Sequence, residues 1–482
     1  MRSAEYVRHD AVGLAELVTA GEVAPAELEA AARAAARAVD RLGAVVETWP
    51  TDDRPRPGSA PLAGVPFLIK DIGVTMAGRR TELGSRLAAG LVAAADSFLM
   101  RRFRRAGLVT FGRTATPELA YDITTEPVLY GATRNPWDPE RSAGGSSGGA
   151  AAAVAAGVVP VAHGTDAAGS LRIPAACTGT FAVKPTRGRI SMGPDADEVF
   201  HGLAVHGAVS RTVRDSAVLL DLTRGPEPGD PYTAPEPSRP YAEEVTRPPG
   251  PLRVGVLAQA WGGRRTTAPV ADALARTVDL LDSLGHRVAE AKVPLGADWE
   301  EFVLAHARLS TANIAATVDA LAAALGRPVD ASTLEPVTLA AHRDGQRVSG
   351  PRLVAALALR NQVTRALARA FDTYDVLLSP TLPDLPPPLG ALADGAAALD
   401  GLGWTDRLLD RSPFTAVFNV TGMPAMSVPL TADPGTGLPI GMQFAAGHGR
   451  EDRLFRLAGQ LERANPWADR TPAVWAGHPT GG

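Results

Sequence analysis

The sequence contains little cysteine, little lysine and few aromatic residues. Its one cysteine, Cys177, excludes an internal disulfide, and the nine scattered histidines show no zinc spacing of the C-x-x-C or H-x-x-x-H kind. We therefore expect no metal and no cofactor. The formal net charge is −4, and no basic stripe is interleaved with aromatic residues, so we expect no nucleic-acid partner.

No hydrophobic run is long enough to predict a membrane span. The longest apolar stretch, residues 148–161, is rich in alanine and glycine and is interrupted by Pro160. The first residues lack a basic segment followed by an apolar one, which a secretion signal needs. We expect a cytoplasmic protein with a small-molecule ligand and no membrane partner.

Lysine occurs only at Lys70, Lys184 and Lys292, whereas 45 residues are arginine. A GC-rich codon bias explains the excess of arginine but not which lysines remain. Lys70 lies within the apolar run GVPFLIKDIGV, where a solubilising charge is unexpected. This lysine is therefore a candidate for a chemical role.

Apolar runs and helical patterns alternate along the chain in the way typical of an α/β fold. Residues 61–75, 108–114 and 158–166 predict buried strands, and residues 10–42 and 97–107 predict helices. A strand–helix–strand unit is expected over 252–293, and 299–372 is strongly helical. The alternation favours an α/β fold with a mixed or mainly parallel sheet.

The glycine–serine cluster GGSSGG, residues 144–149, is the first candidate for chemistry. Read as G-x-S-x-G, it matches a nucleophile elbow, which requires a buried strand just before the serine. The preceding segment, TRNPWDPERSAG, is not such a strand, and the lysine of a phosphate-binding loop is absent. A flexible linker is the structural alternative, although an alanine-rich helix follows directly.

The segment GTDAAGSLRIP, residues 164–174, is the second candidate. Small residues after a strand, followed by Ser170, suit an oxyanion hole, in which several backbone N–H groups point at one oxygen. The alternative is a tight turn into a packed strand. For a base, His163 lies in an apolar strand and is better interpreted as a core histidine. A buried Lys70 would lose much of its basicity and could serve, unless it pairs with Asp71.

Taken together, several segments resemble the amidase signature family of serine hydrolases. They are GVPFLIKDIG, RSAGGSSGG, GTDAAGSLRIPAACTG, KPTRGRIS, SPTLP and PFTAVFNVTGMPAMSVPL, in that order over nearly the whole chain. The resemblance implies an α/β fold with a central mixed β-sheet covered by helices on both faces. It also implies a single amidase signature domain over 1–482, with an inserted, mostly helical lobe at 252–372.

The resemblance assigns a role to each candidate residue. Lys70 matches the base, Ser146 the bridging serine after a cis peptide, and Ser170 the nucleophile. The expected oxyanion hole is the run of N–H groups of Ala167, Ala168, Gly169 and Ser170. The expected acyl-side lining is Ala120, Tyr121, Asp122 and Ile123. Ala168 departs from the glycine common in the family, and Asp122 is either an ammonium-binding group or an exposed or helix-capping aspartate.

The segments KDIG, TTEP, DAAGS and KPTRGRISMGPD are most similar to the family branch that contains 6-aminohexanoate-cyclic-dimer hydrolase. This similarity implies an amidase for small linear or cyclic amides that works through an acyl-enzyme. The alternatives are a carboxylesterase or acyl-transferring amide synthase on the same triad, or a non-catalytic amidotransferase-like subunit. The expected partner is a small-molecule amide substrate, and a homodimer is a further hypothesis.

Overall fold

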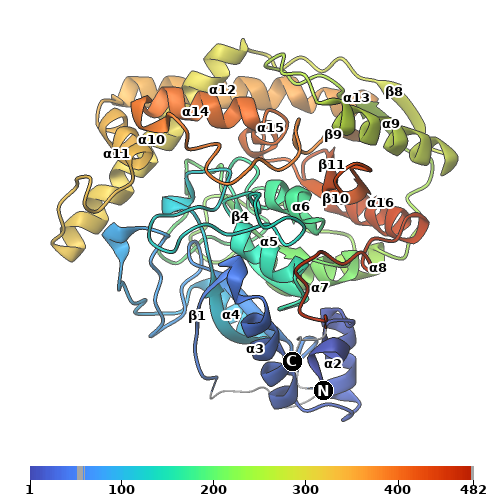
Figure 1. Cartoon of the computed structure of the whole chain (residues 1–482). Helices are drawn as coiled ribbons and strands as arrows, with labels where there is room; N and C mark the ends of the chain where they lie inside the picture. Colours follow the sequence, from blue (N-terminus) through green and yellow to red (C-terminus); the bar gives the residue numbers. More distant parts are fainter. Residues whose placement is uncertain (52–57, 59, 479–482) are drawn as a thin grey trace.

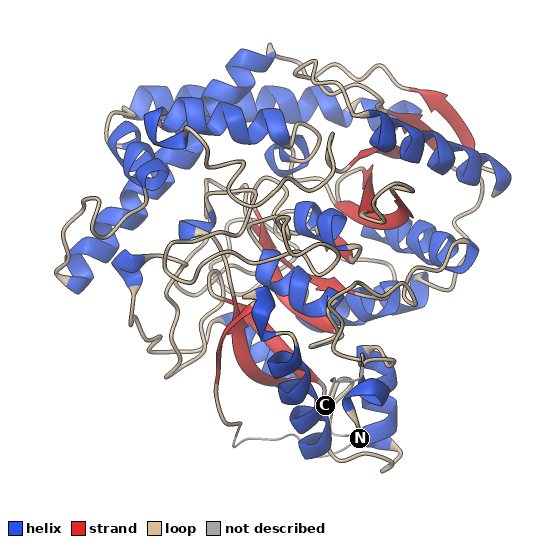
Figure 2. Ribbon diagram, viewed as in Figure 1, coloured by secondary structure: helices blue, strands red, loops and turns tan. Residues whose placement is uncertain are grey.

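A mixed sheet runs through the centre of the chain (Figure 2). The structure, a computed structural model, describes residues 1–51, 58 and 60–478, so the remaining positions of the predicted unit 1–482 lie outside it. Within the described residues the sheet has eleven strands. They are β1 (Val45–Thr48), β2 (Pro66–Lys70), β3 (Val109–Thr114), β4 (Val161–Asp166), β5 (Phe181–Lys184), β6 (Val205–Ser210), β7 (Arg253–Val256), β8 (Arg287–Glu290), β9 (Val376–Pro380), β10 (Ala425–Ala432) and β11 (Pro439–Ala446).

The strand order is β1-β3-β2-β4-β6-β5-β10-β11-β9-β7-β8. Strand β2 pairs in parallel with β3 and β4, and β7 pairs in parallel with β8 and β9. The strands between these two groups pair antiparallel. The predicted mixed sheet is therefore confirmed.

Helices cover both faces of this sheet. The helices are α1 (Ser3–Tyr6), α2 (Ala11–Thr19), α3 (Pro25–Ala38), α4 (Phe98–Arg105), α5 (Gly148–Ala155), α6 (Arg172–Thr178), α7 (Val213–Thr223), α8 (Tyr241–Glu244), α9 (Ala268–Ser283), α10 (Trp299–Leu325), α11 (Pro336–Gly345), α12 (Gly350–Ala368), α13 (Ala370–Thr373), α14 (Gly401–Arg411), α15 (Ala416–Val420) and α16 (Glu451–Ala464). Helices α5 and α6 pack on one face of the central strands, and α4, α7 and α16 pack on the other.

Helix α5 lies unusually close to the strands because its side chains are small. All eight of its residues are buried, and they are glycine, alanine and one valine. A Cβ on Gly149 would overlap the backbone of Ala115 in the segment after β3. The GGSSGG cluster therefore leads into a helix that fits only without side-chain bulk, so the flexible-linker alternative is wrong.

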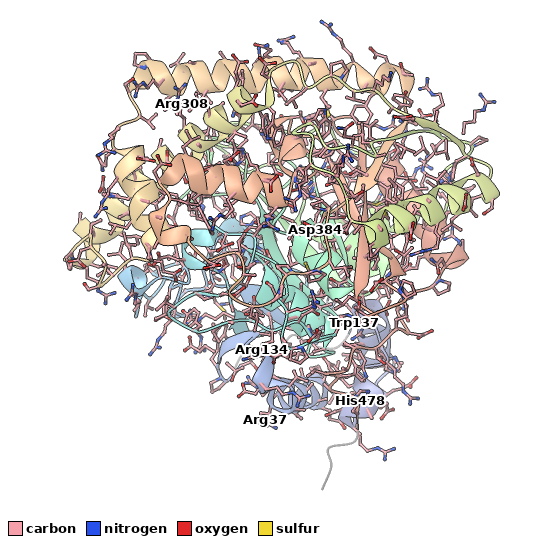
Figure 3. All side chains as sticks on the ribbon, turned by 45° about the horizontal axis from the view of Figure 1, so that its top comes forward. Arg37, Arg134, Trp137, Arg308, Asp384 and His478 are labelled. Carbon is pink, nitrogen blue, oxygen red and sulfur yellow. The ribbon has the colours of Figure 1, made fainter. Side chains whose placement is uncertain are left out.

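Helices α10, α11, α12 and α14 form a separate layer beyond the sheet, at the top of Figure 1. Arg308 of α10 lies at the opposite end of the molecule from Arg37 of α3 and from His478 (Figure 3). The segment 252–372 contributes the edge strand β8 and its neighbour β7 as well as helices of this layer. The division into a domain with an inserted lobe remains a prediction.

The segment after Ser170 is helical. The alternative for residues 164–174, a tight turn into a packed strand, is wrong, because Arg172–Thr178 form α6, with a hydrogen bond from Ile173 N–H to the carbonyl of Gly169. Pro174 falls in the first turn, where its missing N–H has no intrahelical partner to lose. Among the described residues, no helix is both long enough and apolar enough to cross a membrane.

Candidate active site

Lys70 ends β2 and is completely buried. Its neighbour in the sheet, β4, runs in parallel, so the carboxyl ends of both strands meet at one edge. The side-chain nitrogen of Lys70, Nζ, is hydrogen-bonded to three hydroxyl oxygens: Ser146 Oγ at 2.7 Å, Ser147 Oγ at 3.0 Å and Thr165 Oγ1 at 2.9 Å. These three partners carry no charge.

Asp71 is not the partner of Lys70. Its carboxylate accepts a hydrogen bond at 2.5 Å from Arg113, which comes from the neighbouring strand β3. Burial lowers the pKa of Lys70 well below its usual value, and the charge of Asp166 opposes this effect. Burial favours the neutral amine of lysine over the ammonium, and the neutral amine is the form that can accept a proton.

The loop before α5 presents two serines to this lysine. The peptide bond between Gly145 and Ser146 is cis. A Cβ on Gly145 would overlap the carbonyl oxygen of Thr124, so only glycine fits there. The hydroxyl of Ser147 donates to the carbonyl of Thr165 at 3.1 Å and accepts from its N–H at 3.2 Å, which leaves it tied to β4. The nucleophile-elbow interpretation, which would make Ser147 the attacking group, is therefore wrong.

Ser170 follows a turn, residues 167–169, that belongs to neither a helix nor a strand. Gly169 has a φ of +132°, a conformation that side chains rarely adopt, whereas Ala168 has no positive φ and tolerates its Cβ. The Gly169 N–H donates to Asp166 at 2.7 Å. Within the described part of the chain, the N–H groups of Ala167, Ala168 and Ser170 have no partner, so these three can receive an oxyanion.

A buried ion pair holds this turn, and the sequence analysis missed it. Asp166, the last residue of β4, accepts from Arg172 Nε and Nη2, both at 2.9 Å, and neither side chain is exposed. Its carboxylate also accepts from Leu171 N–H at 3.2 Å. Burial alone would raise the pKa of Asp166, but Arg172 outweighs it and holds the pKa at about 2. The two charges inside the otherwise apolar GTDAAGSLRIP segment were the available signal.

Residues from the distant segment PFTAVFNVTG complete the network. Asn419 donates to the Asp166 carboxylate at 2.8 Å and accepts from Arg172 at 2.6 Å. The Thr415 hydroxyl donates to the carbonyl of Ala168 at 2.6 Å. The turn that carries Ser170 is therefore held by the local Asp166–Arg172 pair and by the distant segment that contains Asn419.

Ser170 opens into a pocket, called here the acyl pocket, with an empty volume of about 530 Å³ that includes its open mouth. The pocket is lined by Ala120, Tyr121, Asp122, Ile123, Ala167, Ala168, Ser170, Phe200, Leu203, His306, Ser310, Thr405, Leu408, Leu409 and Ser412. The predicted acyl-side loop is thus brought to the nucleophile candidate. Its backbone is strained, because Leu119 and Ala120 have φ values of 51° and 56°.

Asp122 is neither exposed nor helix-capping, so that expectation is wrong. It is partly buried at the wall of the acyl pocket, where one carboxylate oxygen accepts from Thr124 N–H at 3.0 Å. Burial raises its pKa to about 7, and this hydrogen bond opposes the rise.

His163 is a core histidine, as expected from the sequence. It is fully buried, and its ring accepts a hydrogen bond from the backbone N–H of Lys70 and is hydrogen-bonded to His206.

A family model described as Amidase matches residues 24–455. The chain belongs to the amidase signature family. Among curated relatives, the 6-aminohexanoate-cyclic-dimer hydrolase of Paenarthrobacter ureafaciens is 40% identical over 481 residues, which cover 96% of each protein. A putative amidase of Mycobacterium leprae is 36% identical over 472 residues, which cover 95% of this chain and 96% of the relative.

Solved structures of amidase signature enzymes match over almost the full length. A 6-aminohexanoate cyclic dimer hydrolase complexed with substrate has a TM-score of 0.89 and 37% identity, and covers 97% of this chain and 99% of its own. A bacterial aryl acylamidase of the amidase signature family has a TM-score of 0.83 and 25% identity, with 95% and 97% covered. The family resemblance and the fold are confirmed, and the protein is an amidase, a hydrolase of carbon–nitrogen bonds other than peptide bonds.

Proposed function

We propose that this amidase hydrolyses small linear or cyclic amides through Lys70, Ser146 and Ser170, with an acyl-enzyme on Ser170. The proposal depends most on one observation: a fully buried lysine amine lies 2.7 Å from the Ser146 hydroxyl, beside the pocket that Ser170 lines. A neutral amine in that position can accept a proton, and Ser146 can pass one on.

In the proposed reaction, Lys70 takes a proton from Ser146 while Ser146 takes one from Ser170. The Ser170 oxygen attacks the amide carbonyl, and the N–H groups of Ala167, Ala168 and Ser170 stabilise the oxyanion. The carbon–nitrogen bond then breaks as the proton returns through the same relay to the leaving amine. Water attacks the Ser170 ester and releases the carboxylic acid, which restores the free serine.

The proposed substrate class is supported by the relatives' names. Two relatives at 40% and 39% identity are called 6-aminohexanoate-cyclic-dimer hydrolase. The acyl pocket offers mainly apolar side chains and a volume suited to a small acyl group. We therefore propose small amides with an aliphatic acyl part.

A fluorophosphonate probe tests the nucleophile. We expect one covalent adduct per chain, located on Ser170 by peptide mass spectrometry, and none on Ser170→Ala. An adduct on Ser146 or Ser147 would contradict the assigned roles. The absence of any adduct on a folded protein would favour the non-catalytic subunit.

A substrate panel tests the reaction. Aryl amides, primary amides, lactams and esters of the same acyl group should all be compared, and we expect amides to be turned over. Turnover of esters alone would favour a carboxylesterase. Added hydroxylamine measures acyl transfer, because a transferring enzyme would form mainly the hydroxamate instead of the acid.

Asp122 can be tested as a selectivity residue in the same panel. The measurement is the ratio of kcat/KM for a substrate with a distal ammonium group to kcat/KM for its uncharged analogue. Since the pKa of Asp122 is raised to about 7, the carboxylate ionises above that pH, and the ratio should rise with pH. Asp122→Asn should remove this rise. An equal effect on both substrates would make Asp122 structural.

A further inference from the structure

An imidazole ring accepts the backbone N–H of the catalytic-base candidate, Lys70. Strands β2 and β4 pair at Leu68 and Ala162, and the next residue of β4 is His163. Nδ1 of its ring accepts the hydrogen bond from Lys70 N–H at 3.3 Å. A side chain therefore does here what a strand carbonyl does in a regular ladder, at the point where β2 presents Lys70 to the site.

A second imidazole supports the first. Nε2 of His163 lies 3.1 Å from Nδ1 of His206, which β6 places opposite Thr165. Neither side chain is more than 1% exposed. The His163 ring packs edge-on against Phe103, with centroids 5.8 Å apart, and a Cβ on Gly73 would lie only 3.3 Å from the His206 ring. Both rings are thus constrained by their neighbours as well as by their hydrogen bonds.

The hydrogen bonds determine which nitrogen carries the proton in each ring. A neutral imidazole has one N–H donor and one acceptor nitrogen. Since Nδ1 of His163 accepts from Lys70, the proton of His163 is on Nε2, which donates to Nδ1 of His206. His206 then carries its own proton on Nε2. The Lys70 amide therefore sets the tautomer of both rings.

The pair is uncharged. Burial lowers the pKa of His163 well below its usual value, and the charges of His206 and Lys70 lower it further. Burial also lowers the pKa of His206 to about 4, and Lys70 adds to this effect. A carboxylate could accept the same N–H, but its negative charge would raise the pKa of Lys70. A neutral imidazole holds the strand without favouring the ammonium form of the lysine.

We propose that His163 and His206 are positioning residues for Lys70. His163 holds the backbone of Lys70 so that Nζ stays aligned with Ser146, and His206 keeps His163 in the tautomer that can do so. Without the acceptor on His206, the proton of His163 could move to Nδ1, where two donors would face each other. The inference rests on the proposed function, because it takes Lys70 as the base, and neither ring exchanges a proton in the reaction.

The first test separates kcat from KM. His163→Leu removes the acceptor and should lower kcat at least about tenfold with little change in KM, because a displaced base slows the chemical step more than binding. His163→Asn should recover most of kcat, since asparagine Oδ1 occupies nearly the position of Nδ1. The matched control is His286→Leu: Nδ1 of His286 accepts from Leu252 N–H at 3.2 Å, near β7 and several strands from β2. It should lower the Tm but leave kcat unchanged.

The second test acts on the tautomer alone. His206→Leu should lower kcat as well, and His206→Asn, which keeps an acceptor at the same position, should restore it. In wild type labelled with ¹⁵N-histidine, NMR at neutral pH should find both rings neutral with the proton on Nε2. The signals of the two rings are assigned by their loss in the asparagine variants. This measurement needs no variant that lacks a hydrogen bond, so it stands even if the leucine variants fail to fold.

Two kinds of result would overturn the positioning role. One is a charged His163, or a His163 with its proton on Nδ1, in the wild-type spectrum. The other is a folded His163→Leu with unchanged kcat, or a loss that His163→Asn does not recover. If Lys70→Arg is inactive in the same assays, such a result removes the positioning role alone. Full activity of Lys70→Arg would instead overturn the proposed function and the positioning role with it.

Discussion

Replacing Asp166 by asparagine tests whether the buried ion pair holds the nucleophile turn. The substitution keeps the side chain's shape and removes its charge, so Arg172 loses its ion-pair partner while both remain buried. Removing one partner of a buried pair costs about 3–5 kcal/mol. The pKa shift gives a free energy of the same order. The pKa of Asp166 falls from 3.8 to about 2 in the folded state, which corresponds to about 2 kcal/mol of stability.

The pH dependence of this stabilisation follows from the lowered pKa of Asp166. Since the folded pKa lies below the unfolded one, this stabilisation is fully present above pH 3.8 and is lost as the pH falls through about 2. Urea unfolding at neutral pH should therefore show Asp166→Asn destabilised by about 3 kcal/mol. The control, Asp96→Asn, breaks a more exposed pair with Arg104 and should cost less than about 1 kcal/mol.

The same variant has a signature in catalysis. Asp166 raises the pKa of Lys70, so removing its charge should move the rise of kcat/KM with pH to lower pH. The maximal rate should also fall, because the NH2 group of asparagine cannot accept a hydrogen bond, so the turn that carries Ser170 loses the bond from the N–H of either Gly169 or Leu171. A destabilisation below about 1 kcal/mol, with an unchanged pH profile, would refute the assigned role of this ion pair.

Three further predictions concern single side chains. Ser170→Ala should lose essentially all turnover, and Ser146→Ala should be severely but less completely impaired, because water can partly replace a relay hydroxyl; equal turnover of the two would contradict the relay. Lys70→Arg should fold yet be nearly inactive, as measured by circular dichroism and kcat, since arginine does not release its proton; retention of more than about a tenth of wild-type turnover would argue against a base. Cys177 is buried and its pKa is raised to about 12, so a thiol reagent such as iodoacetamide should leave the folded enzyme unlabelled and active, and rapid labelling of Cys177 would contradict its protection by burial.

Local sequence signals located the candidate triad. Lys70 was recognisable because a lysine in an unbroken apolar run has few structural uses, and its contacts with Ser146 and Ser147 agree with that interpretation. Small residues ahead of Ser170 likewise pointed to free backbone amides. Such features depend on a few neighbouring residues, so they can be recognised from the sequence alone.

The partners of the site could not be predicted in the same way. Asn419 contacts Asp166 and Thr415 contacts Ala168 across about half the chain, and only the fold brings these pairs together. Asp71 lies next to Lys70 in sequence yet pairs with Arg113, because adjacent residues of a strand point to opposite faces. Similarly, the partial burial of Asp122 depends on packing between distant segments.

The scarcity of lysine, combined with burial, has a practical consequence for chemical labelling. Lys70 and Lys184 are completely buried, whereas Lys292 is exposed in the loop after β8. Among the lysines, an amine-reactive ester applied to the folded enzyme should therefore modify Lys292 alone. Coupling to a solid support through lysine would therefore attach the molecules by the face that carries Lys292, without any engineered tag. Conversely, the appearance of label on Lys70 would report, peptide by peptide, that the core around the catalytic-base candidate has opened.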